Sequence, residues 1–175
     1  MVKFQASQAA LDMVRRLGHR MIDPYPALTP LLGDGSHESL AGVSLPVRLR
    51  ARVDQKTLET EGGFLFTHRG YSGPAVLDLS HLTSRGELPV IRAQWSPLTQ
   101  QQWAREFEAP SASVATLLAR HIPARLSERL MTETGVPADR RTSALKRAER
   151  LALVEALTAY VVPWTGNEGY KKAEV

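Results

Sequence analysis

The sequence contains no cysteine and no hydrophobic run approaching the about 20 residues that a membrane-spanning helix needs. Without cysteine, neither a disulfide framework nor a thiolate zinc site can form. Residues 1–4 lack the long apolar core of a signal peptide. We therefore expect a cytoplasmic protein without a membrane-spanning segment.

Aromatic residues make up only 6% of the chain, and the net charge is a modest +4. A basic ladder of Arg48, Arg50 and Arg52 follows one face of an alternating strand pattern. Its ordinary interpretation is a solvated face; the alternative is an anionic partner, either nucleic acid or a missing parent domain. Because no exposed aromatic residues are interleaved to stack on bases, the sequence argues against a nucleic-acid partner.

The stretch from Gly62 to Leu82 has the most distinctive local pattern. Gly62-Gly63 predicts a turn, and Phe64 to Thr67 predicts a short apolar strand. A glycine-containing loop follows, after which Pro74 to Leu82 predicts a helix with Ser72 as its N-cap. This arrangement points backbone N–H groups and the positive end of a helix dipole at whatever lies above the loop.

Three ordered segments resemble motifs of one flavoprotein family. Phe66 to Ala75 resembles FTHxGxSGPA, Gly18-His19 with Pro26 to Leu31 resembles GH…PALVPL, and Gly166 to Tyr170 with 173–175 resembles GTEGF…AEV. The family comprises the NAD(P)/FAD-dependent oxidoreductases that include aminoacetone oxidase and the BaiN/YhiN flavoproteins. In these proteins the segments lie in a domain inserted into the FAD-binding Rossmann domain.

The resemblance implies an excised insert of a larger flavoprotein. The implied fold class is α+β, with a small antiparallel β-barrel-like subdomain and an irregular array of about four helices. The insert would cover the flavin side and shape substrate access, with the FAD-binding domain of the same polypeptide as its partner. We expect a GxGxxG unit upstream and TAGGV downstream, and we expect the isolated chain to bind no FAD and to be inactive.

Patterning along the chain agrees with two subdomains. Residues 1–96 with 158–175 form the predicted β-rich part, which includes an N-terminal helix over 7–17, and residues 97–157 form the predicted helical part. The strands are predicted at 43–53, 57–61, 64–67, 88–95 and 158–165. The helices are predicted at 98–107, from Ser111 or Ser113, from Pro123, and from Thr142 or Ser143.

The resemblance makes the central loop the candidate site. His68 is the candidate catalytic residue in the full-length protein, and its alternative role is to hydrogen-bond the loop backbone. The candidate flavin-facing residues are Thr67, His68, Gly70, Tyr71, Ser72, Gly73 and Pro74. Ser72 with Pro74 can fix the helix start, and the glycines permit the loop's bend. We therefore expect His68, Arg69 and Tyr71 to project from the loop.

Other chemistries are weaker interpretations. Pro74 breaks the G-x-S-x-G pattern of a hydrolase around Ser72. His68 and His81 have no acidic or cysteine cluster at ligand spacing, so no metal site is predicted. Gly33 to Glu38 lacks the last glycine of a dinucleotide fingerprint. The competing function is a free-standing basic β-barrel module that binds RNA or protein.

Overall fold

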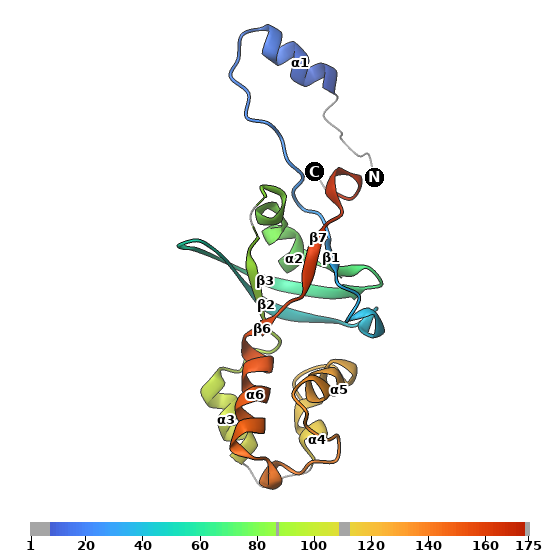
Figure 1. Cartoon of the computed structure of the whole chain (residues 1–175), viewed down its shortest axis with the longest axis vertical. Helices are drawn as coiled ribbons and strands as arrows, with labels where there is room; N and C mark the ends of the chain where they lie inside the picture. The colour runs from blue at the N-terminus through green and yellow to red at the C-terminus, as the bar shows by residue number, and fades with distance from the viewer. Residues whose placement is uncertain (1–7, 87, 109–112, 174–175) are drawn as a thin grey trace.

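The computed structural model describes residues 8–86, 88–108 and 113–173 (Figure 1). Within these residues, seven strands form one antiparallel sheet in the order β6-β5-β2-β3-β4-β1-β7. The strands are β1 (Leu31–Gly33), β2 (Ser44–Val53), β3 (Lys56–Thr67), β4 (Gly70–Ser72), β5 (Val90–Gln94), β6 (Tyr160–Val161) and β7 (Trp164–Asn167).

The sheet is curled upon itself. Its two edge strands, β6 and β7, are consecutive in the chain and are separated only by Val162 and Pro163. Val161 and Trp164 are three residues apart, which spans at most about 11 Å, so the two edges of the sheet lie close together at this point. The predicted barrel-like antiparallel architecture within an α+β fold is confirmed.

Strand β2 forms where the predicted alternation places it. Its burial alternates residue by residue, with Leu45, Val47, Leu49 and Ala51 on the buried face. This period of two fits a strand with one face on the core and one in solvent. The prediction of a strand over 43–53 is therefore confirmed.

The predicted turn at Gly62-Gly63 is wrong. Both glycines lie inside β3, a single twelve-residue strand, where they pair with Val47 and Pro46 of β2. A Cβ atom on Gly62 would lie 3.4 Å from the backbone nitrogen of Ala75 in helix α2. These glycines therefore let the helix approach the strand closely instead of bending the strand.

Six α-helices occur within the described residues. They are α1 (Gln8–Arg16), α2 (Pro74–Leu79), α3 (Gln100–Glu108), α4 (Val114–Leu118), α5 (Ala124–Glu133) and α6 (Arg147–Thr158). Helices α3 to α6 confirm the predicted helical array. Ser113 caps α4 by accepting a hydrogen bond from the N–H of Thr116.

Helix α6 begins later than the sequence predicted. Thr142 to Ala144 form a short 3-10 turn, and the α-helix starts at Arg147. The carboxylate of Glu149 accepts the N–H of Lys146 at 2.8 Å, which satisfies a backbone donor at the new start. A side-chain cap three residues into the helix therefore decided where it begins.

One hydrophobic core joins the two parts of the molecule. Buried residues from the sheet, such as Leu49 and Trp95, belong to the same cluster as Trp103 of α3 and Leu153 of α6. Figure 1 shows the helical array against one end of the sheet, while α1 projects from the other end on a long extended segment. The division into two subdomains stays a prediction.

Because an inserted domain leaves and re-enters its host, the resemblance predicts that Met1–Lys3 and Lys172–Val175 lie on the same side of the molecule. These segments fall partly outside the described residues. Just inside these ends, the N–H of Glu168 donates to the carbonyl of Pro30 at 3.0 Å. The hydroxyl of Thr29 donates to the carbonyl of Gly169 at 3.2 Å. The first strand and the last one therefore lie side by side, away from the helical array (Figure 1).

Candidate functional site

The three motif segments, far apart in the sequence, meet on neighbouring strands. In β1, Leu31 pairs with Tyr71 of β4 on one side and with Asn167 of β7 on the other. The N–H of Gly33 donates to the carbonyl of Arg69 at 2.8 Å. The strands β4, β1 and β7, with the turn before β4, form what we call the motif face. Sequence reasoning found its parts, but only the sheet order joins them.

The turn at the tip of the motif face is fixed by its own backbone. The hydroxyl of Thr67 accepts hydrogen bonds from the N–H of Arg69 at 3.3 Å and of Gly70 at 3.1 Å. His68 and Arg69 are exposed at this turn, as the sequence predicted. The guanidinium of Arg69 lies 3.6 Å from the carboxylate of Glu168, which joins the central motif to the last one.

Two expectations for this loop are wrong. Tyr71 does not project from the loop, because it lies in β4 and is 1% exposed. Ser72 does not cap α2, because it also belongs to β4 and Gly73 occupies the N-cap position. Three residues of strand were hidden in a segment too short and too glycine-rich to show a period of two.

Gly70 and Gly73 serve close backbone packing. A Cβ atom on Gly70 would lie 2.3 Å from the carbonyl oxygen of Leu31, and one on Gly73 would lie 2.5 Å from that of Gly63. Gly73 also has φ of 100°, in the region that favours glycine. Both glycines therefore allow neighbouring backbone segments of the motif face to pack closely, because a side chain at either position would clash.

The hollow at the tip is very small. It has a volume of about 10 Å³, enough for about one water molecule, and its lining includes Gly33, His37, His68 and Gly70. A flavin ring does not fit into it. This hollow therefore cannot enclose a cofactor, and His68 and Arg69 lie exposed beside it.

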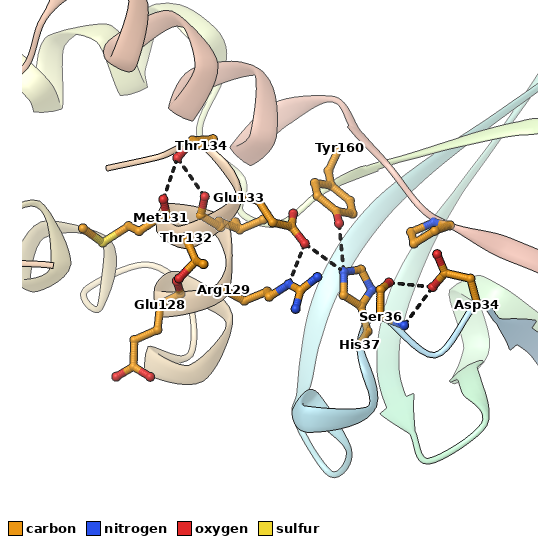
Figure 2. A network of polar contacts seen from close by, with 12 residues as sticks. Asp34, Ser36, His37, Glu128, Arg129, Met131, Thr132, Glu133, Thr134 and Tyr160 are labelled. Carbon is orange, nitrogen blue, oxygen red and sulfur yellow. Dashed lines mark hydrogen bonds and ion pairs between the residues drawn. The ribbon is translucent and has the colours of Figure 1, made fainter. Parts of the chain in front are cut away.

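Behind this hollow lies a buried polar network around His37 that sequence reasoning missed; Figure 2 shows its contacts with Tyr160 and Glu133. His37 is 6% exposed, and its Nδ1 lies 2.9 Å from the Tyr71 hydroxyl. Its Nε2 lies 2.8 Å from the Tyr160 hydroxyl and 3.5 Å from the Glu133 carboxylate. The network therefore connects the loop before β2, the motif face, strand β6 and helix α5.

The hydrogen bonds assign the histidine tautomer. The Tyr71 hydroxyl donates its proton to the carbonyl of Pro163 at 3.0 Å. Its oxygen must then accept from Nδ1–H of His37, which leaves Nε2 to accept from the Tyr160 hydroxyl. A neutral imidazole satisfies all of these contacts.

Burial favours the neutral form of each group. It lowers the pKa of His37 below the ordinary histidine value, although the Glu133 carboxylate acts in the opposite direction. Burial also raises the pKa of both the Tyr71 and Tyr160 phenols above their ordinary values, and the Glu133 charge adds to each shift. The Glu133 carboxylate is paired with Arg129, 2.5 Å away on the same helix.

No spacing in the sequence signals this network. His37 follows the polar loop 33–36, and its partners are 34, 96 and 123 residues further along the chain. The one available hint was a lone histidine in the polar segment between β1 and β2, which is too common to single out.

Comparison with known proteins identifies the fold family. A family model described as HI0933-like protein barrel and H2TH domain matches residues 25–175. The chain belongs to this HI0933-like family. The family lies within the FAD-dependent oxidoreductase superfamily, in agreement with the coarser part of the resemblance seen in the sequence.

Two curated relatives carry the same name. The chain is 37% identical over 158 residues to a ribosomal RNA dihydrouridine synthase of Escherichia coli, covering 87% of this chain and 37% of that protein. It is 28% identical over 174 residues to a ribosomal RNA dihydrouridine synthase of Haemophilus influenzae, covering 97% of this chain and 42% of that protein. The chain thus spans about two fifths of the length of these relatives.

The HI0933-like chain carries its arginine ladder on the outer face of the sheet. Arg48 pairs with Glu61 at 3.1 Å, and Arg50 pairs with Glu59 at 2.8 Å, both across the β2–β3 hairpin. Strand β5 adds Arg92, which lies directly opposite Arg50. The ladder predicted from one strand is therefore part of a wider basic face.

Two kinds of feature are absent from the described part of this HI0933-like chain. Across residues 8–86, 88–108 and 113–173, no helix has the length and apolarity to cross a bilayer. In the same ranges, no three side chains among histidine, aspartate and glutamate gather in a way that could hold a metal ion.

Proposed function

We propose that this chain is the barrel and helical part of an FAD-dependent enzyme that reduces uridine in ribosomal RNA to dihydrouridine. The motif face carries the proposal: three segments that resemble flavoprotein motifs converge on β4, β1 and β7. The name of the two curated relatives supplies the substrate. A ribosomal substrate agrees with the expected cytoplasmic location.

In this proposal the rest of the same polypeptide binds FAD. No GxGxxG strand–loop–helix unit occurs in the sequence, and the motif face offers a wall instead of a pocket. The chain is inserted into that FAD-binding domain, and the contact between Pro30 and Glu168 supports this topology because it brings the two connecting segments together. The motif face then covers the flavin side and shapes access for the RNA.

The reaction balances with a nicotinamide donor. Uridine, NAD(P)H and one proton yield dihydrouridine and NAD(P)⁺, and the bound flavin carries the two electrons between donor and uracil ring. His68 is exposed at the tip of the motif face, and imidazole can donate and accept protons near neutral pH. We assign His68 to hold or deliver the proton that the uracil ring gains.

The relatives favour RNA over a small amine. The resemblance also includes aminoacetone oxidase, whose name implies oxidation of a small amine. Both curated relatives instead carry the ribosomal RNA name. A wall with a hollow of about 10 Å³ also has no cavity for a small molecule of its own. We therefore prefer a large substrate that is held mainly elsewhere.

Two substitutions in the complete protein test the assignment. His68→Ala should lower dihydrouridine formation at least tenfold or perturb the flavin absorption spectrum, and should change the melting temperature little, because the side chain is exposed. Gly73→Val should do the reverse, lowering stability by roughly 3 kcal/mol or more through the clash with Gly63 and the unfavourable φ.

Dihydrouridine is measured in ribosomal RNA by mass spectrometry, beside NAD(P)H oxidation and thermal unfolding. His121→Ala, which removes an imidazole from the helical array, is the matched control and should leave activity unchanged. If His68→Ala alters neither kinetics nor flavin spectrum, the role assigned to His68 is wrong. If the wild-type protein forms no dihydrouridine with NAD(P)H, the substrate is wrong.

A further inference from the structure

The outer side of the sheet carries a concentrated set of guanidinium groups. Arg48, Arg50 and Arg52 recur at every second position of β2, so they point to the same side, and Arg92 of β5 lies beside them in register. We call these four residues the arginine face. Tertiary structure created it, because β5 is about 40 residues away from β2 in the sequence.

The charges on this face are only partly compensated. Arg48 and Arg50 have carboxylate partners in Glu61 and Glu59. Arg52 instead donates to the carbonyl of Asp54 at 3.3 Å, and Arg92 donates to the carbonyl of Ala159 at 3.1 Å. Within residues 8–86, 88–108 and 113–173, neither Arg52 nor Arg92 has a carboxylate at ion-pair distance. Two positive charges are therefore in excess.

The register of the sheet puts two of these cations in direct opposition. Arg50 of β2 and Arg92 of β5 are paired residues of neighbouring strands. Like charges at directly opposed positions destabilise a sheet. Glu59 pairs with Arg50 and offsets part of this repulsion, and an anion bound beside Arg92 would relieve the rest. Both arginine side chains are exposed, so such an anion can reach them.

The face is also hollowed. A depression of about 560 Å³ is lined by Arg50, Arg52, Thr57, Glu59, Val90 and Arg92. This volume is in the range of sites for whole molecules and far exceeds the space needed for a single ion. Guanidinium groups bind phosphate oxygens through paired, parallel hydrogen bonds, so their number and spacing suit a chain of phosphates.

We propose that the arginine face binds the sugar–phosphate backbone of ribosomal RNA. This proposal rests on the proposed function for the identity of the RNA. It replaces the expectation from the sequence that nucleic acid is not a partner, because that expectation considered base stacking and not phosphate contacts. The paired outer positions of β2, β3 and β5 between 48 and 61 and between 90 and 94 hold no aromatic residue on which a base could stack. The face therefore contacts phosphates and fixes the position of the RNA without reading its sequence.

The arginine face lies at a distance from the tip of the motif face, so RNA binding and the proposed reaction take place at different positions. Strand β3 runs from Thr57 and Glu59, at the arginine face, to Thr67, at the tip of the motif face. Eight residues from Glu59 to Thr67 span roughly 26 Å of strand. Figure 1 shows the β2–β3 hairpin reaching out beyond the rest of the sheet. Loss of the arginines should thus raise KM for RNA and leave kcat unchanged.

The test uses the complete protein with Arg52→Gln and Arg92→Gln combined. The control combines Arg120→Gln and Arg147→Gln, which removes the same charge from exposed positions of the helical array. The probes are fluorescein-labelled 20-nucleotide RNAs of two unrelated sequences, followed by fluorescence anisotropy at several salt concentrations. The face variant should bind both RNAs at least tenfold more weakly, with a salt slope reduced by about 1.4, or about 0.7 for each lost phosphate contact.

Several results would overturn the proposal. They are unchanged RNA affinity in the face variant, an equal loss in face and control variants, a loss for one RNA sequence only, or a face that binds polyglutamate as tightly as RNA.

Dihydrouridine formation separates the two proposals. If the wild type forms dihydrouridine and the face variant keeps its KM, only the arginine face is wrong. If the wild type forms none but binds RNA through Arg52 and Arg92, the face stands and the proposed reaction fails.

Discussion

His37 shows how one residue can depend on the whole fold. Its imidazole contacts phenols from β4 and β6 and a carboxylate from α5, while Phe66 lies against its ring at 5.7 Å. A buried polar group is tolerated only when its hydrogen bonds are satisfied. The two tyrosine contacts fit the neutral form, and burial favours that form against the opposing effect of the Glu133 carboxylate.

This gives a prediction for pH dependence. The pKa of His37 is lower in the folded chain than the ordinary value of about 6.5, so the unfolded chain binds the proton more readily. Stability should therefore be complete above about pH 6.5 and should fall as the pH drops below it. The groups that face the imidazole are Tyr71, Tyr160, Glu133, Arg129 and Asp34.

His37→Gln should lower the melting temperature at neutral pH, because hydrogen bonds are lost, and should also flatten its decline towards about pH 5. Thermal unfolding followed by circular dichroism at several pH values measures both effects. His19→Gln, at an exposed position, is the control. An equally flattened profile in both variants would rule out His37 as the source.

Among the elements, α6 shows how a helix start is chosen. Thr142 and Ser143 are good N-cap residues, yet the helix begins at Arg147. The carboxylate of Glu149 accepts the N–H of Lys146 and also lies 3.3 Å from the guanidinium of Arg140. Glu149 is therefore held from two sides.

Glu149→Ala should destabilise the chain by about 1–2 kcal/mol, because it removes a cap and one partner of a half-buried ion pair. Urea denaturation at neutral pH measures this loss. Glu155→Ala, on an exposed position of the same helix, should change stability by less than about 0.5 kcal/mol. Equal effects of the two substitutions would contradict the capping role.

Strand β2 shows which local signals were reliable. Its alternation predicted the strand, and Pro46 suggested a strand start with a free side. The pairing of β5 with β2 begins only at Arg48, so Pro46 has β3 as its hydrogen-bonded neighbour and needs no second partner. Pro46 therefore lies in the part of β2 that extends beyond its pairing with β5.

For the whole molecule, the shared core predicts autonomous folding. Buried residues of the sheet and of the helical array form one cluster, so the isolated chain should unfold in a single cooperative transition. Because it contributes a wall and not a flavin pocket, it should purify without FAD. Calorimetry and the visible absorption spectrum test both points. Stoichiometric flavin in the purified chain, or no cooperative transition, would refute the prediction.

The sequence by itself determined the strong periodic elements and the family. The alternation of β2, the helices opened by Ser113 and Pro123, and the three motif segments are local patterns of side chains, so they are visible without coordinates. They also suffice for the α+β class and for the place of His68 at an exposed turn.

Only the tertiary structure decided what those patterns form together. It made Gly62 and Gly63 part of a long strand, buried Tyr71, joined His37 to Glu133, and set Arg92 opposite Arg50. Each of these outcomes depends on partners that are distant along the chain. Sheet register and close backbone packing are global properties, and no local period of side chains encodes them.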